Sequence, residues 1–110
     1  MAVYVKTENA SELLGKLKKA IDEDKIKTWK YDEDGDFFHS PDQWQYNGWL
    51  RPVTTEKYLV FGIICPKNES MSTLTYAVYH GRFIEMMLNN FDSDFDLIYA
   101  SAQKTKYDIY

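Results

Sequence analysis

The residues best suited to metal chemistry stand close together in the first half of the chain. Asp32, Asp34 and Asp36 alternate with other residues, and His39 follows shortly afterwards. Carboxylate oxygens and an imidazole nitrogen can hold a divalent cation that activates water, which is the chemistry of a metal-dependent phosphodiester hydrolase. An EF-hand is excluded, because Phe37 stands at the sixth position from Asp32, where that loop needs glycine. Hydrated surface acids explain the cluster more simply, so a metal site at these four residues is the alternative interpretation.

Aromatic side chains and an arginine gather around an Asn-Gly turn signal in the segment WQYNGWLR. A two-residue hairpin turn would place Tyr46 opposite Trp49 and Trp44 opposite Arg51. The four side chains would then share one face, where a guanidinium can stack on an indole. Trp, Tyr and Arg are enriched at the centres of protein interfaces, so this aromatic hairpin is the predicted partner-binding site. The same rings could instead cover an open end of the core, and both interpretations stay open.

A third candidate is a small-molecule pocket on the second predicted helix. His80 falls within a broad apolar arc of this helix and is followed directly by Gly81, and Tyr79, His80 and Phe83 would line the pocket. A glycine allows a close approach, and an imidazole supplies a polar contact. The residues therefore suggest a sensing domain with a ligand between helix and sheet. A buried, hydrogen-bonded histidine is the simpler explanation.

The single cysteine, Cys65, limits the redox chemistry of the chain. One cysteine excludes an internal disulfide and a four-cysteine zinc site. Cys65 ends an apolar run and precedes Pro66, with nothing nearby to favour the thiolate that a nucleophile requires. We therefore expect a packed thiol, no catalytic residue and no cofactor. The lone cysteine and the lack of an N-terminal signal segment favour a cytoplasmic location.

The charge balance disfavours nucleic acid as a partner. Thirteen Lys and Arg oppose 17 Asp and Glu, which gives a net charge of −4. The segment from Asp32 to Asp42 holds five acids and no Lys or Arg. Phosphate backbones are bound mainly through Lys and Arg, so they would be repelled here. An acidic surface suits a basic protein partner instead.

The apolar patterns predict two helices and several strands. Alternating or continuous apolar residues predict strands over residues 2–6, 58–65 and 95–99, and a further strand beginning near Ile26. Helical spacing predicts one helix from an Asn9 cap to about residue 23, and another from Ser70 or Ser72 to about Phe91. The expected inner stripe of the second helix comprises Leu74, Ala77, Ile84, Leu88 and Phe91. Asp34-Gly35 predicts a two-residue hairpin turn, with Tyr31 opposite Phe38.

This order of elements predicts an α+β domain with the ferredoxin-like, or split βαβ, layout. Two helices would cover one face of a mainly antiparallel sheet, with the aromatic hairpin as an insertion. The first strand and the apolar strand over residues 58–65 would lie at the centre. With 110 residues, the chain is expected to form a single domain over residues 1–110.

The leading functional hypothesis is a noncatalytic protein-interaction or regulatory domain. It would bind another protein, or a second copy in a homodimer, through the aromatic hairpin and the acidic surface. No stretch approaches the ~20 apolar residues that span a bilayer, so no membrane partner is expected. The metal-dependent hydrolase and the small-molecule sensor are the alternatives.

Overall fold

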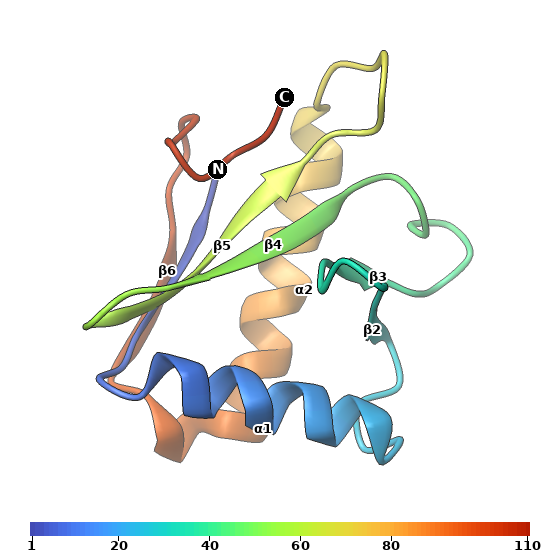
Figure 1. Ribbon diagram of the computed structural model, residues 1–110. Coiled ribbons are helices and arrows are strands. Elements are labelled where there is room, and N and C mark those ends of the chain that lie inside the picture. The colour runs from blue at the N-terminus through green and yellow to red at the C-terminus, as the bar shows by residue number, and fades with distance from the viewer.

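The structure is a computed structural model that describes residues 1–110 and contains one antiparallel sheet and two α-helices (Figure 1). The sheet has six strands in the order β2-β3-β4-β5-β1-β6, and each neighbouring pair is antiparallel. The elements are β1 (Val3–Lys6), α1 (Ala10–Asp22), β2 (Trp29–Tyr31), β3 (Phe37–His39), β4 (Trp49–Thr54), β5 (Tyr58–Ile64), α2 (Thr73–Phe91), the 3₁₀ turn η1 (Asp92–Asp94) and β6 (Leu97–Ala100). The predicted α+β class is confirmed.

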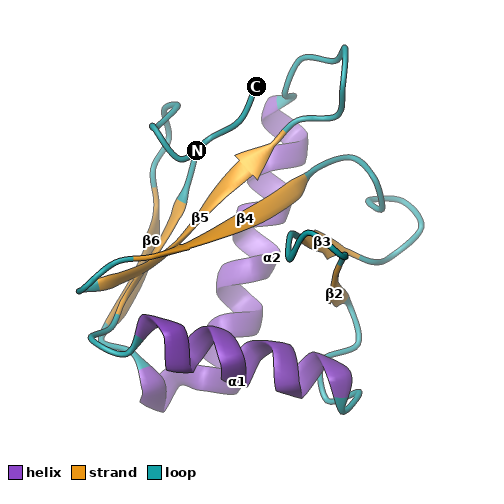
Figure 2. Ribbon diagram, in the orientation of Figure 1, coloured by secondary structure: helices purple, strands orange, loops and turns teal.

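Both helices pack on the same face of the sheet, and they run crosswise to each other (Figure 2). Buried side chains of α1 and α2, such as Leu17 and Phe83, join one apolar cluster with Phe61 of β5. The rings of Phe61 and Phe83 lie 4.5 Å apart between centroids. The opposite face of the sheet carries no helix. Neither helix is long and apolar enough to cross a membrane.

The strand order differs from the ferredoxin-like prediction. As expected, β1 and β5 are central neighbours, and β6 lies at an edge. The strand predicted near Ile26 is β2, which was expected to lie beside β5. Instead β3 and β4 separate β2 from β5, and β2 forms the far edge of the sheet. The ferredoxin-like topology is therefore not confirmed.

The prediction of an aromatic hairpin is wrong. Its second half instead begins β4, which lies between β3 and β5 in the sheet. Residues 42–46 form turns, and β4 begins at Trp49 instead of pairing back onto Trp44. β4 pairs with β5 along its whole length, which buries Leu50 beside Ile63. Burial against the most apolar strand of the chain outweighs the local preference of Asn-Gly for a tight turn. Pro52 lies beyond the single pair that joins β3 to β4, so this part of β4 has a free edge, where proline is tolerated.

The turn between β2 and β3 is longer than predicted. Asp32 N–H donates to Asp36 O at 3.0 Å, and Gly35 N–H donates to Asp32 O at 3.0 Å. Three residues therefore lie between the closing pair, with Gly35 in the left-handed region at φ 81°. A type I turn followed by a left-handed glycine is the usual three-residue hairpin loop.

This extra turn residue shifts the strand register by one position. Trp29 pairs with His39 and Tyr31 pairs with Phe37, whereas Tyr31 was expected to face Phe38. A one-residue shift moves a side chain to the other face of a sheet. Trp29, Phe37 and His39 are consequently buried in the core, and Phe38 lies on the helix-free face.

Helix α2 forms over the predicted span but buries a different side. Ser72 is its N-cap, and the Ser72 hydroxyl accepts a hydrogen bond from Thr75 N–H at 2.9 Å. Leu74 and Leu88, expected inside, are 66% and 49% exposed. The buried side chains are Tyr79, His80, Phe83, Met86, Met87 and Phe91. Apolar residues lie on several sides of this helix, and the side that carries the aromatic rings of Tyr79 and Phe83 packs into the core.

The C-terminal segment, residues 101–110, returns to the sheet beside β5. Ile109 N–H donates to Ile63 O at 2.8 Å, and Ile63 N–H donates to the Asp108 carboxylate at 2.9 Å. Gly62 allows this approach, because a Cβ at that position would lie 1.9 Å from Tyr107 O. The segment therefore completes the part of β5 that β1 does not reach.

Candidate functional site

A groove at the β2 end of the sheet brings together aromatic and acidic side chains. It has a volume of about 730 Å³ and is open to solvent. We call it the aromatic–acidic groove, and its lining residues are Tyr31, Asp32, Glu33, Asp34, Phe38, Tyr46 and Trp49. Tyr46 and Trp49 were predicted for partner binding, and Asp32 and Asp34 for metal binding. The fold thus unites two sequence signals that were expected at separate sites.

Three rings form the aromatic wall of the groove. Phe38 of β3 is stacked with Tyr46, which belongs to the loop between β3 and β4. The ring centroids are 6.2 Å apart, and the interplanar angle is 23°. Tyr46 is 65% exposed and adopts the left-handed φ of 67°, which is uncommon for a bulky residue. Trp49 is half-buried, and strand alternation places it on the face opposite Leu50. An exposed tyrosine held over a second ring offers a flat surface to a ligand.

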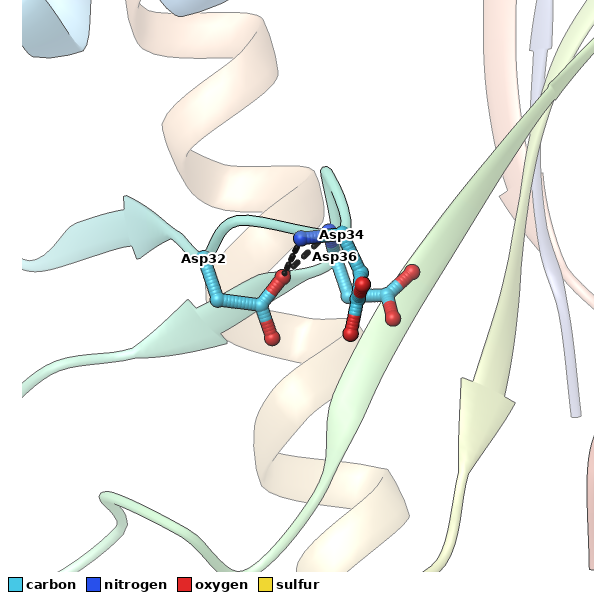
Figure 3. A group of neighbouring side chains, drawn as sticks. All are labelled: Asp32, Asp34 and Asp36. Carbon is cyan, nitrogen blue, oxygen red and sulfur yellow. Dashed lines mark hydrogen bonds between the residues drawn. The ribbon is translucent and has the colours of Figure 1, made fainter.

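The acidic side of the groove is the β2–β3 turn, shown in Figure 3. One carboxylate oxygen of Asp32 accepts hydrogen bonds from the backbone N–H groups of Asp34 and Asp36, both at 3.0 Å. Asp32 therefore holds the turn in shape. Glu33 and Asp34 are exposed, and neither takes part in an ion pair. Their charges face water beside the aromatic wall.

Asp36 and Arg51 fasten the acidic turn to β4. Arg51 donates from Nε and Nη2 to the two carboxylate oxygens of Asp36 at 2.9 and 2.8 Å. This hydrogen bonding raises the pKa of the Arg51 guanidinium. Arg51 was predicted to stack on an indole, and the structure instead places its guanidinium on Asp36. Arg51 thus neutralises Asp36 and leaves the groove with its remaining negative charge.

Lys18 of α1 places a cation beside the acidic turn. Its Nζ lies 5.5 Å from the centroid of the Tyr31 ring, and it would be 3.7 Å from a Cβ at Gly35. The Tyr31 hydroxyl donates to Asp22 at 2.6 Å, and this hydrogen bond raises the pKa of Tyr31. Lys18 and Asp22 therefore anchor one rim of the groove to α1. The Lys18 ammonium over Tyr31 is already one cation placed over a ring that lines the groove.

The four residues predicted to bind a metal do not all meet. One carboxylate oxygen from each of Asp32, Asp34 and Asp36 lies within 4.8 Å of the others. However, Asp36 is already bound by Arg51, and Asp32 is bound by backbone amides. His39 is buried on the core side, where its Nδ1 lies 2.8 Å from Thr28 O. Burial lowers the pKa of His39, because the core disfavours the charged form of the ring.

The residues predicted to line a sensor pocket fill the core. Tyr79 and Phe83 both pack edge-on against Trp29. The Tyr79 hydroxyl donates to Trp44 O at 2.7 Å, and burial raises the pKa of Tyr79 to about 12. His80 is buried, its Nε2 contacts the carbonyl of Met1, and its Nδ1 has no hydrogen-bond partner. Burial lowers the pKa of His80.

Trp44 and Cys65 lie outside the groove. Trp44 was predicted beside Tyr46 for partner binding, but it packs against the core cluster and presents its carbonyl to Tyr79. The Cys65 thiol donates to Glu69 O at 3.0 Å, and burial raises its pKa. A raised pKa disfavours the thiolate. Cys65 is only half-buried, so it is not the fully packed thiol that the sequence led us to expect.

Sequence reasoning did not assign Phe38 and Tyr31 to the site. Gly35, which interrupts the acidic run before Asp36, could have indicated a three-residue turn, which would have turned Phe38 toward the helix-free face. The loop conformation of Tyr46 had no comparable sequence signal.

Comparison with known protein families, curated proteins and solved structures found no match for this chain.

Proposed function

We propose that this protein is a noncatalytic interaction domain whose aromatic–acidic groove binds a basic side chain of a partner protein. The observation that carries the proposal is that the unpaired carboxylates of Glu33 and Asp34 line one groove with the exposed ring of Tyr46 and the half-buried ring of Trp49. An arginine or lysine side chain matches both halves of that cavity. Its cationic head would lie near Glu33 and Asp34, and its flat or aliphatic part would lie over Tyr46 and Trp49.

Physical chemistry favours arginine over lysine as the bound group. A guanidinium stacks on aromatic faces and forms two parallel hydrogen bonds with a carboxylate, which an ammonium cannot do. A cation over an aromatic ring contributes about 0.5–1 kcal/mol at an exposed site. One such contact gives weak binding, so a useful affinity requires neighbouring contacts from the same partner segment. The open groove therefore suits a peptide segment better than an isolated metabolite, which usually needs an enclosed pocket.

The experiment that tests this proposal is a nuclear magnetic resonance titration with a short peptide that has one central arginine as its only charged group. We expect saturable shifts of the Trp49 indole N–H signal, while the buried Trp29 signal stays in place. Tyr46→Ala should weaken binding by about twofold to fivefold, as expected from loss of one cation–ring contact. Tyr110→Ala is the control, because Tyr110 is 43% exposed at the far end of the chain.

The outcome that would overturn the proposal is equally specific. If the peptide causes no saturable shift at Trp49 at millimolar concentration, the groove does not recognise this group. Shifts that are equal in the Tyr46→Ala and Tyr110→Ala variants would also contradict it, because the binding would then lie elsewhere.

We also propose a topological interpretation of the sheet. Strands β6, β1, β5 and β4 are consecutive antiparallel neighbours, and α1 and α2 cover one of their faces. This arrangement supports a ferredoxin-like unit to which β2 and β3 have been added ahead of β4. The added strands would then be the part of the fold that builds the groove, since they supply the acidic turn and Phe38.

A further inference from the structure

The two free edges of the sheet differ in how well they are protected from pairing. The β2 edge has three residues, with the exposed Lys30 at its middle. The β6 edge has the uncharged sequence LIYA, in which Leu97 and Tyr99 are each 43% exposed. Natural sheets usually protect a free edge with charge, proline or a covering segment. β6 has none of these within its four residues, and it lies at the outside of the sheet (Figure 1).

The backbone of β6 offers hydrogen-bonding groups on its free side. Ser101 N–H donates to Ala2 O at 2.9 Å, which fixes the phase of the ladder between β6 and β1. In an antiparallel ladder, alternate residues point their N–H and C=O groups to opposite sides. Tyr99 and Leu97 therefore face β1, and Ile98 and Ala100 present their backbone groups outward. Four groups are available for another strand.

We propose that β6 pairs in antiparallel orientation with β6 of a second copy of this chain. In the register that uses all four outward groups, Ile98 of one copy faces Ala100 of the other. Tyr99 then lies on the two-fold axis, opposite Tyr99 of the second copy. A shift of two residues in either direction would align only one residue of each copy, which leaves two hydrogen bonds instead of four.

The side chains on the helix-free face match this register. The rings of Tyr99 and Tyr4 are stacked with centroids 5.0 Å apart, and Tyr58 and Tyr107 each pack edge-on against Tyr4. Residues that face each other without exchanging hydrogen bonds lie about 4.5 Å apart between Cα atoms. The two Tyr99 rings would therefore meet and join the two clusters. Aromatic cross-strand pairs of this kind stabilise a sheet.

The charges that flank β6 favour a second copy in antiparallel orientation as the occupant. The exposed acids Asp92 and Asp96 precede the strand, and Lys104 and Lys106 follow it. Antiparallel pairing brings the acidic end of each β6 toward the basic end of the other, whereas parallel pairing brings like charges together. The edge is therefore complementary to itself.

This dimer would have a consequence for the groove. β6 and β2 lie at opposite edges of the sheet, so the aromatic–acidic groove stays far from the paired strands. A two-fold axis perpendicular to a continuous sheet keeps both helix-free faces on the same side. The dimer would then present two grooves toward one partner surface, which raises binding strength by multivalency. The proposed pairing itself does not depend on what the groove binds.

The test is the mass of the protein in solution, measured by sedimentation equilibrium at the concentrations of a magnetic resonance sample. We expect twice the mass of the chain. Tyr99→Glu and Tyr99→Lys should each raise the dimer dissociation constant by about tenfold or more, because like charges meet on the axis. An equimolar mixture of the two variants should recover the dimer. The same exchanges at Leu88, which is 49% exposed on α2, should leave the wild-type mass unchanged.

A disulfide experiment keeps the proposal testable if the charged variants unfold. In a Cys65→Ser background, Tyr99→Cys should give a covalent dimer on mild oxidation, because about 4.5 Å between Cα atoms suits a disulfide. Leu97→Cys is the matched control, because residue 97 would face residue 101 of the other copy. A monomeric wild-type protein, a mixture of charge variants that folds but stays monomeric, or equal cross-linking at positions 97 and 99 would each overturn the proposal.

Discussion

The ion pair between Asp36 and Arg51 should couple the acidic turn to β4 by a measurable free energy. The Asp36 side chain is 6% exposed and that of Arg51 is 45% exposed. Hydrogen bonds between charged groups contribute about 1.5–3 kcal/mol when shielded from water, and exposed pairs contribute about 0–1 kcal/mol. Because only the carboxylate is shielded here, we expect a coupling free energy of about 1–2 kcal/mol.

The two single variants should differ in a defined direction. Asp36→Asn removes the charge but keeps a group that can accept one hydrogen bond from Arg51. Arg51→Gln leaves a nearly buried carboxylate without its cation, which costs more than the loss of the attraction alone. We therefore expect Arg51→Gln to lower the free energy of unfolding more than Asp36→Asn does.

Urea denaturation of the wild type, the two single variants and the double variant completes the cycle. Tryptophan fluorescence is a suitable signal, because Trp29 is fully buried in the folded protein. A coupling free energy below about 0.5 kcal/mol would show that the pair behaves as an ordinary surface contact and does not fasten the turn to β4. A smaller effect of Arg51→Gln than of Asp36→Asn would contradict the argument from burial.

Three further predictions follow from the core and the C-terminal segment. Gly62→Ala should lower the free energy of unfolding by about 2–4 kcal/mol and make the last residues sensitive to protease, because the added Cβ would meet a backbone oxygen at 1.9 Å; an unchanged digestion pattern would contradict this. Phe83→Ala should lower the free energy of unfolding by about 3–5 kcal/mol, whereas Leu74→Ala should change it by less than about 0.5 kcal/mol, because only Phe83 is buried. Similar changes for both variants in urea denaturation would contradict the assignment of the Phe83 side of α2 to the core. Burial lowers the pKa values of His39 and His80 below 6.5, so the unfolded chain binds more protons than the folded protein just below that pH. Stability should therefore fall as the pH drops below about 6.5, and the melting temperature should show a weaker pH dependence in a variant with both histidines replaced by Asn.

The elements that local patterns determine were predicted well. β1, α1 and β5 follow from apolar spacing within a few residues, and the structure has them close to their expected bounds. The cap at Ser72 was also expected, since a hydroxyl before a helix satisfies a free backbone N–H. These features depend on neighbours in the sequence, so a single sequence is enough to find them.

The features that depend on distant partners were not predicted. The Asn-Gly signal indicated a hairpin, but pairing of β4 with β5 buries Leu50 and determines the outcome. On α2, Leu74 was expected in the core and Phe83 at a ligand pocket, but Phe83 is the buried residue because its ring packs against Trp29 and Phe61. Local patterns cannot rank such alternatives, because the competing contacts come from other parts of the chain.

The candidate site shows the same division. The sequence identified Asp32, Asp34, Tyr46 and Trp49 as residues of interest, because their types suit binding. The sequence did not show that these residues lie in one groove with Phe38. The face that Phe38 occupies depends on the register of β2 and β3, which changes with a single residue in the turn between them.

Whether the groove recognises a positive charge can be measured with two peptides. The peptides differ only in one residue, arginine in the first and citrulline, its neutral isostere, in the second. We expect the arginine peptide to bind at least about tenfold more tightly at low salt, and we expect this preference to shrink in a variant with Glu33→Gln and Asp34→Asn. Equal dissociation constants for the two peptides would contradict recognition of a positive charge by the groove.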